Sequence, residues 1–251
     1  MQHLIEKAAV LIEALPYIQK FRNSTVLVKF GGSAMEDPAI TRSVIRDIVF
    51  MECAGMKPIV VHGGGKAITA ALKAEGVPTR FVNGLRYTCE RTMRVVDRVL
   101  HGEINASLVK MMHDLGGKPF ALSGKSVLRG EKVNTTDGAT GAEVDLGFVG
   151  RVVNVDTEQI RWVLNRGEVP VLTPLACEMG GAVLNVNADM AACEVAAQLK
   201  CRKLVFLSDV PGVLRDPADE STLISTIRRQ DIEPMIAAGV LTGGKTGRAN
   251  V

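Results

Sequence analysis

Clustered charge and long apolar runs are both missing from this sequence of 251 residues. The formal net charge is +3, and the scattered lysines and arginines disfavour a nucleic-acid or anionic-membrane partner. No stretch approaches the roughly 18 apolar residues that a membrane span requires. Near the start, Glu6, Lys7 and Glu13 interrupt the apolar run that a signal peptide would need. The sequence therefore predicts no membrane partner and a cytoplasmic location.

Cysteine pairs and histidine clusters are missing as well. The five cysteines form no Cys-x-x-Cys motif and lie in apolar or helical contexts, at Cys53, Cys89, Cys177, Cys193 and Cys201. This pattern is typical of free thiols in a reducing compartment rather than of disulfides or a zinc site. The four histidines lie far apart in the sequence. We therefore expect no metal site built by the protein itself.

Strand and helix patterns alternate along most of the chain. Hydrophobic residues make up 47% of the sequence, enough for the core of one large or two modest domains. Apolar strands such as TVLVKF and PIVVHG are each followed by a helical pattern, and a long helix is expected over CERTMRVVDRVLHGEINASLVKMMHDLGG. Asn83-Gly84 predicts a hairpin turn, residues 127–156 read as hairpins projecting from the sheet, and VPVLTPLA reads as one strand. The sequence predicts an α/β fold with an open, mainly parallel sheet sandwiched by helices.

The first 22 residues form a helical pattern of their own. Apolar residues recur at three- and four-residue steps from Leu4 to Ile18, and Pro16 is expected to kink the helix. The apolar stripe has two interpretations, an arm packed on its own core or an arm docked on another subunit.

Three glycine-rich turns each follow an apolar strand, at residues 29–33, 62–66 and 122–125. Ligands bind at the carboxyl ends of the strands in an open α/β sheet. Glycine lets backbone N–H groups approach an oxyanion, and the helix that follows adds its positive end. A single Gly-Gly pair is more often only a turn, but three on one sheet favour an anion site. None matches G-x-G-x-x-G, which disfavours a dinucleotide enzyme.

The order and spacing of six segments resemble the N-acetylglutamate kinases of the amino-acid kinase family: VLVKFGGS, PIVVHGGGKAI, NGLRYT, GFVGRVVNVD, LNVNADMAA and LSDVPGVL. The resemblance runs from the N-terminal helix to about Gly244, and its HGGG, NGLR and NVNAD segments separate this branch from aspartate, carbamate and uridylate kinases. It implies transfer of the γ-phosphoryl group of ATP, carrying Mg²⁺, to the γ-carboxylate of N-acetyl-L-glutamate in arginine biosynthesis. It also implies an arm helix at 1–22, an acid-substrate lobe at 23–198 and a nucleotide lobe at 199–251.

The resemblance assigns roles to residues of this sequence. A carboxylate nucleophile is ionised at neutral pH, so the reaction needs no general base, in line with the lack of a His or Cys constellation. Lys29 stabilises the transferring phosphoryl group, and Asp189 orients the lysines. The expected acid-substrate residues are Gly64, Gly65, Arg86 and Asn185, and the expected nucleotide residues are Gly31, Gly32, Ser208, Asp209 and Gly212. Oligomers are implied too, a dimer or a hexamer linked through the N-terminal helix.

Several of these residues also have purely structural interpretations. Asn185 and Asp189 fit a strand end and a helix N-cap, and Arg86 fits a solvated hairpin residue. Lys29 is harder to explain in this way, because a lysine at the end of an apolar strand has little structural purpose. The joint arrangement of these residues carries the functional interpretation.

The C-terminal stretch GVLTGGKTGRANV departs from the resemblance. It matches the phosphate-loop pattern from Gly239 to Thr246, but it follows a helix and is too close to the end to open another, so we interpret the match as accidental. Arg248 stands where the family has a second catalytic lysine, and Lys245 stands at a methionine position. Ser126 replaces a usual aspartate. The resemblance therefore implies an incomplete nucleotide lobe.

Two other interpretations stay open at this point. A non-catalytic ligand-binding or assembly paralogue would keep the acid site and the arm without transferring phosphate. Another phosphoryl transferase of the same family would act on a different acid.

Overall fold

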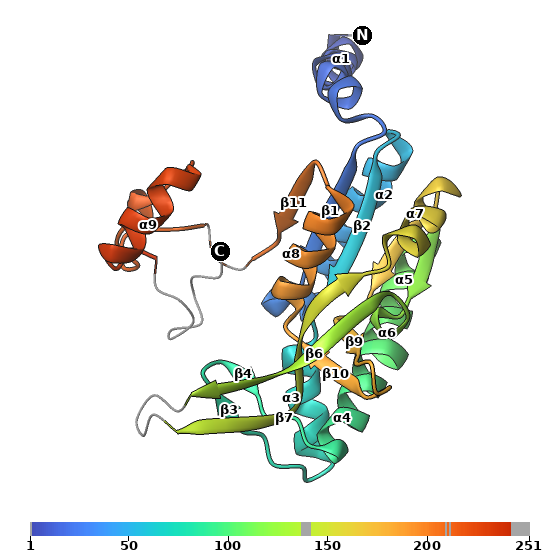
Figure 1. Ribbon diagram of the computed structural model, residues 1–251. Helices are drawn as coiled ribbons and strands as arrows, with labels where there is room; N and C mark the ends of the chain where they lie inside the picture. The colour runs from blue at the N-terminus through green and yellow to red at the C-terminus, as the bar shows by residue number, and fades with distance from the viewer. Residues whose placement is uncertain (1, 137–141, 209, 211, 242–251) are drawn as a thin grey trace.

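A five-stranded parallel sheet forms the centre of the computed structural model, which describes residues 2–136, 142–208, 210 and 212–241 (Figure 1). The strand order is β11-β1-β2-β8-β5, and every neighbouring pair is parallel. The strands span Thr25–Phe30 (β1), Lys57–His62 (β2), Pro119–Leu122 (β5), Val169–Leu172 (β8) and Lys203–Phe206 (β11). The prediction of an α/β fold with a mainly parallel sheet is confirmed.

Helices cover both faces of this sheet. Along β1 and β2 the side chains alternate, so that Leu27, Ile59 and Val61 pack in one core and Val28 and Val60 pack in another. The helices span Gln2–Phe21 (α1), Pro38–Cys53 (α2), Gly65–Ala74 (α3), Glu90–Asp97 (α4), Ala106–Asp114 (α5), Gly124–Val127 (α6), Thr157–Asn165 (α7), Ala188–Leu199 (α8) and Arg229–Ala237 (α9), with short 3₁₀ turns at Gly32–Met35 (η1) and Glu220–Thr222 (η3).

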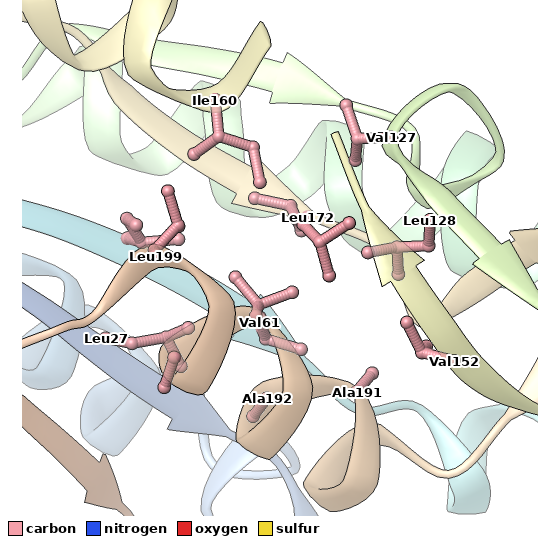
Figure 2. Close-up of a cluster of buried hydrophobic side chains, with 14 of the residues drawn as sticks. Leu27, Val61, Val127, Leu128, Val152, Ile160, Leu172, Ala191, Ala192 and Leu199 are labelled. Atoms are coloured by element: carbon pink, nitrogen blue, oxygen red, sulfur yellow. The ribbon is translucent and has the colours of Figure 1, made fainter. Parts of the chain in front are cut away.

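Helix α8 packs on the face of the sheet that carries Leu27. Figure 2 shows Ala191, Ala192 and Leu199 of α8 next to Leu27 and Val61. Small residues on α8 let the helix lie close to the strands, and the buried cluster continues to α7 and to β6. Because Lys29 follows Leu27 by two positions, its side chain leaves the strand on the α8 face.

A closed barrel of four strands adjoins the sheet, in the order β10-β7-β6-β9. It is built from Leu128–Thr136 (β6), Glu143–Val155 (β7), Leu175–Cys177 (β9) and Val183–Val186 (β10). The β6–β7 hairpin confirms the hairpin prediction, but the sequence did not predict closure into a barrel. The expected single strand over VPVLTPLA is wrong, since the chain leaves the main sheet after β8 and enters the barrel as β9.

The short hairpin of Phe81–Val82 (β3) and Leu85–Arg86 (β4) lies beside this barrel (Figure 1). Its turn residues Asn83 and Gly84 have φ angles of 49° and 79°, as a two-residue type I′ turn requires. This turn confirms the hairpin prediction from Asn-Gly.

The expected long helix after residue 89 is interrupted by a π-helix (η2) at Arg98–Asn105. This segment lies between α4 and α5. The prediction of a long helical segment is confirmed, because α4, the π-helix and α5 follow one another without a break from Glu90 to Asp114, but the sequence did not predict the π-helical turn.

Helix α1 extends away from the rest of the chain at the top of Figure 1. It continues from Gln2 to Phe21 with Pro16 inside it. The side chains of Ile5, Ile12 and Leu15 are 55%, 69% and 47% exposed. At these three positions the apolar stripe does not pack on the chain's own core, which contradicts the first interpretation of the arm.

Candidate functional site

Lys29 and Asp189 form an ion pair at the carboxyl end of β1. The ammonium Nζ of Lys29 lies 2.8 Å from Oδ1 of Asp189, and the two side chains are 15% and 21% exposed. Asp189 lies in the first turn of α8, and the helix is capped by Asn187, whose Oδ1 accepts from the N–H groups of Asp189 and Met190. The interpretation of Asp189 as the N-cap is therefore wrong, because that task belongs to Asn187.

The glycine turns after β1 and β2 touch each other. The N–H of Gly63 donates to the carbonyl oxygen of Phe30 at 2.8 Å. A Cβ on Gly31 would lie 3.4 Å from Cα of Gly63 and 3.3 Å from Nζ of Lys29. A side chain at position 31 would thus crowd both the second turn and the Lys29 ammonium, so glycine leaves the backbone open there. Gly32 has a φ angle of 74°, which favours glycine by conformation.

Helix α3 begins directly after the second turn. Gly64 is its N-cap and Gly65 its first residue, and the cap position makes no side-chain hydrogen bond. A Cβ on Gly65 would have no heavy atom within 4 Å among the described residues. The first N–H groups of a helix are free to donate when no side chain caps them, and they carry the positive end of the helix dipole. This end of α3 therefore suits an anionic group.

Arg86 lies against the same end of α3 and is buried. Its Nη2 donates to the carbonyl oxygen of Gly65 at 2.9 Å and to Oγ1 of Thr69 at 2.8 Å. Its guanidinium stacks on the ring of Phe81 with 4.6 Å to the centroid, and the residue is 8% exposed. The interpretation of Arg86 as a solvated hairpin residue is therefore wrong.

The second terminal nitrogen of Arg86, Nη1, is buried and has no hydrogen-bond partner within the part of the chain that the structure describes. Burial lowers the pKa of Arg86 from its ordinary value, since water no longer stabilises the charge. An unpaired buried donor is unfavourable, and a carboxylate placed at Nη1 would remove that cost. The residue therefore fits an anionic ligand at the start of α3.

Thr88 connects Arg86 to Asn185. Its hydroxyl donates to the carbonyl oxygen of Arg86 at 2.8 Å and accepts from Nδ2 of Asn185 at 3.2 Å. Asn185 lies near the end of β10, four residues before Asp189. These contacts run from Lys29 through the two glycine turns to Arg86, and from Arg86 through Thr88 to Asn185. The chain from Asn185 to Asp189 then leads back to Lys29, so the contacts form a closed ring, which we call the circuit of contacts. The sequence did not single out Thr88 or Thr69, although Thr88 lies within the NGLRYT segment.

Three of the expected nucleotide residues, Ser208, Asp209 and Gly212, follow β11, which lies next to β1. The N–H of Leu207 donates to the carbonyl oxygen of Lys29 at 3.0 Å, which places Ser208 close to the end of β1. Gly212 has a φ angle of 145°, a conformation that side chains rarely adopt. Asp209, Lys245 and Arg248 lie outside the described residues.

The third glycine turn does not belong to this circuit. The N–H of Gly124 donates to Oγ1 of Thr173 at 2.9 Å, and a Cβ on Gly124 would lie 2.2 Å from the carbonyl oxygen of Thr173. Lys125 pairs with Asp97 at 2.9 Å. The expectation of three anion-binding turns is therefore corrected to two, because this glycine permits close backbone packing.

His62 and Asn105 lie buried behind the second turn, and sequence reasoning missed both. His62 contacts the carbonyl of Gly63 through Nδ1 and the amide of Asn105 through Nε2, at 3.0 and 3.1 Å. Burial lowers the pKa of His62 to about 4. His62 belongs to the HGGG segment, whereas Asn105 lay in an unmarked stretch of expected helix.

The described residues gather no group of three or more His, Cys, Asp or Glu side chains that would hold a metal ion. They also contain no helix long and apolar enough to cross a membrane.

The chain is similar over most of its length to proteins of one kinase family. The sequence pattern of the amino acid kinase family matches residues 24–246. An acetylglutamate kinase from Akkermansia muciniphila is 45% identical over 242 residues, which cover 96% of this chain and 81% of the relative. One from Archaeoglobus fulgidus is 43% identical over 244 residues, covering 96% and 84%. A crystal structure of a Streptococcus mutans protein has a TM-score of 0.72 at 28% identity, covering 88% of this chain and 85% of that one.

Proposed function

Since this chain belongs to the amino acid kinase family, we propose that it transfers the γ-phosphoryl group of ATP to the γ-carboxylate of N-acetyl-L-glutamate, a step of arginine biosynthesis. The observation that carries the proposal is the circuit of contacts, in which an ion-paired lysine and a buried arginine are joined through two glycine turns. Acetylglutamate carries two carboxylates and ATP carries a phosphate chain, so both substrates are anions.

The chemistry requires positive groups rather than a base. The γ-carboxylate is already ionised at neutral pH, given an ordinary pKa of about 4.3. The barrier lies in bringing two anions together and in the charge that shifts during transfer. Lys29 is the proposed stabiliser of the transferring phosphoryl group, and Asp189 holds its ammonium in place through the 2.8 Å ion pair.

The acid substrate is proposed to bind between α3 and β10. Nη1 of Arg86 would donate to the α-carboxylate, and the N–H groups of Gly64 and Gly65 would face the carboxylate that is phosphorylated. Asn185 would hold the acetamido end, and Thr88 keeps the Asn185 side chain next to Arg86.

The nucleotide is proposed to lie over Gly31 and Gly32 and along Ser208, Asp209 and Gly212. We retain the division into an acid-substrate lobe at 23–198 and a nucleotide lobe at 199–251. Mg²⁺ binds phosphate oxygens and keeps several waters, so it needs no dedicated cluster of carboxylates. When bound with ATP, the metal would neutralise part of the negative charge on the phosphate oxygens.

Calorimetric titration with acetylglutamate and with Mg-ATP separately tests the proposal, together with trapping of the acyl phosphate by hydroxylamine. Binding of both ligands and formation of the hydroxamate are the expected results. Binding of the acid alone would instead favour the non-catalytic paralogue, and trapping only with a different acid would favour another transferase of the family. Binding of neither ligand would contradict the proposal.

The protein is also proposed to be a homo-oligomer to which α1 contributes. The exposed apolar side chains on α1, at Ile5, Val10, Ile12, Leu15 and Tyr17, would be buried by a second copy of the helix. Deleting residues 2–22 is expected to reduce the number of subunits in the oligomer, as measured by sedimentation velocity. An unchanged oligomeric state would contradict a role of the arm. The free state of all five cysteines supports a cytoplasmic location.

A further inference from the structure

A buried polar contact lies beneath the glycine turn at 63–65 and takes no part in the chemistry described above. His62 is 0% exposed and ends β2, whereas Asn105 is 1% exposed and ends the π-helix. Nδ2 of Asn105 lies 3.1 Å from Nε2 of His62 and donates to the carbonyl oxygen of Val171 at 2.8 Å. The two side chains therefore join β2, β8 and the π-helix under the proposed substrate site.

The contacts fix where the protons of both side chains lie. The carbonyl oxygen of Val171 can only accept, so the Asn105 atom that faces it is the amide nitrogen. That nitrogen has a second hydrogen for Nε2 of His62, which must then accept. The proton of the neutral ring is therefore on Nδ1, which lies 3.0 Å from the carbonyl oxygen of Gly63 and donates to it. Flipping the amide would place acceptors against both carbonyl oxygens.

Both backbone polar groups of Gly63, its N–H and its carbonyl, are therefore hydrogen-bonded. Its N–H donates to the carbonyl of Phe30 in β1, and its carbonyl accepts from His62. The π-helix also contacts the next residue directly, because a Cβ on Gly64 would lie 2.7 Å from side-chain atoms of Leu100 and of Ile104. A π-helical turn holds an extra residue, which reorients the side chains that follow it, and such turns are frequent at functional sites.

We propose that Asn105 and His62 are positioning residues for the glycine turn at 63–65, and that Asn105 selects the Nδ1-protonated tautomer of His62. The proposal rests on the proposed function, in which the N–H groups of Gly64 and Gly65 face an anionic substrate. Neither side chain touches substrate. Their effect is to keep the Gly63 carbonyl bonded and thereby to aim the two N–H groups that follow it.

The low pKa of His62 agrees with this arrangement. Burial lowers it to about 4, the neighbouring imidazole of His101 lowers it slightly, and the bond to Gly63 opposes them. The ring is therefore neutral at neutral pH, where it has one proton to place. Asn105 decides which nitrogen carries that proton.

The Asn105→Asp substitution in the full chain tests the proposal, because it keeps the shape of the side chain and replaces the donor by an acceptor. Nε2 of His62 would then need the proton, and the carbonyl of Gly63 would lose its donor. Nitrogen-15 NMR of the histidine-labelled chain should show His62 protonated on Nδ1 in the unsubstituted protein. In the variant the ring should be protonated on Nε2 or on both nitrogens.

The same variant should lower kcat for acetylglutamate by about tenfold to a hundredfold, as expected when a reacting group is displaced. A doubly protonated His62 would serve both acceptors, so the ratio of variant to unsubstituted kcat should rise as the pH falls from 8 to 6. A general loss of packing would lower kcat without this pH dependence. Asn165→Asp is the matched control, since Asn165 contacts Lys57 at the opposite end of β2 and should keep kcat unchanged.

Three results would overturn the proposal. One is a proton on Nε2 of His62 in the unsubstituted chain, which needs no variant and no activity. Another is an Asn105→Asp protein with unchanged tautomer and unchanged kcat. If that variant does not fold, Asn105→Ala replaces it, and an unchanged kcat there is the third. An unsubstituted chain that does not phosphorylate acetylglutamate would refute the proposed function, while the NMR result would still decide the tautomer.

Discussion

Two glycine turns of this protein share a Gly-Lys pair between an apolar strand and a helix but have different physical tasks. The turn after β2 reads His-Gly-Gly-Gly-Lys and the turn after β5 reads Leu-Ser-Gly-Lys, each between an apolar strand and a helix. After β2, a Cβ on Gly65 would meet no described heavy atom within 4 Å. After β5, a Cβ on Gly124 would collide with two backbone carbonyl oxygens. The turn after β2 leaves space next to Gly65, whereas backbone atoms fill the space next to Gly124 in the turn after β5.

Lys29, which precedes the glycine turn after β1, and Lys125, which belongs to the turn after β5, differ in the same way. Lys29 precedes an open glycine turn, and its partner Asp189 belongs to the first turn of α8. Lys125 of α6 forms an ion pair with Asp97 of α4, and the N–H of the neighbouring Gly124 donates a hydrogen bond to Thr173. A strand followed by glycine and lysine therefore indicates a tight turn, and only the tertiary contacts decide whether a ligand fits there.

The largest expected effect is on folding, from Gly124→Ala. Its Cβ would lie 2.2 Å and 2.3 Å from the carbonyl oxygens of Thr173 and Leu175, and backbone atoms cannot move aside cheaply. We expect a loss of about 3 kcal/mol and a Tm lower by roughly 6–12 °C in calorimetry. Gly65→Ala is the matched control, which should keep its Tm but weaken acetylglutamate binding. Equal Tm values for both variants would remove the contrast between the turns.

The next effect separates the lysines by turnover. Lys29→Ala should lower kcat by about a hundredfold or more with little change in KM, because its charge acts mainly in the transition state. Lys125→Ala should keep kcat and lose at most about 1 kcal/mol of stability, since its ion pair is about one-third exposed. Comparable kcat values for the two variants in a steady-state assay would show that Lys29 is only a structural ion pair.

Much of the fold followed from local signals in the sequence. Asn83-Gly84 predicted the β3–β4 turn, because turn chemistry acts over a few residues. The division of VPVLTPLA between two sheets was not predictable in this way. Both of its halves are buried and apolar, and only their partners distinguish them, β2 and β5 for one half and β10 and β6 for the other.

The resemblance singled out candidate site residues at strand ends and helix starts. Lys29 at the end of a buried strand and Asp189 at the start of a helix were singled out, and the structure brings them to 2.8 Å. Asn105 was not, because its partners His62 and Val171 are 43 and 66 residues away and its segment reads as ordinary helix. The burial of Arg86 was equally hidden, since hairpin residues are commonly exposed and its cover comes from Phe81 and α3.

Substitution of Arg86 tests whether the open turn after β2 receives a carboxylate at the Arg86 side. Arg86→Ala should weaken acetylglutamate binding by roughly 2–3 kcal/mol in calorimetric titration, the expected loss of a charge-assisted hydrogen bond. Arg86→Lys should recover only part of this, because it keeps the charge without the planar fork. Arg151→Ala, at an exposed pair with Glu131, is the control and should bind normally. An unchanged affinity for Arg86→Ala would remove it from the site.

The smallest expected effect is a loss of folding stability at acidic pH. It arises from His62, which lies beneath the turn after β2. His62 has a pKa of about 4 in the folded chain and an ordinary value of 6.5 when unfolded. Above pH 6.5 neither state is protonated and the folded chain has its full stability. As the pH falls toward 4, the unfolded state takes up a proton that the folded state excludes, so stability is lost, by about 2 kcal/mol between pH 7 and pH 5. The loss levels off below about pH 4.

Urea unfolding at pH 7, 6 and 5 measures this loss. His62→Gln does not titrate there, so its unfolding free energy should fall by about 2 kcal/mol less than that of the unsubstituted chain over the same range. Thr173, which accepts from Gly124 beneath the other turn, does not titrate either, so Thr173→Ser should keep the full pH dependence of the unsubstituted chain. If His62→Gln and Thr173→Ser showed the same slope, the acid sensitivity would arise elsewhere, and the turn after β2 would have no neutral histidine to support it.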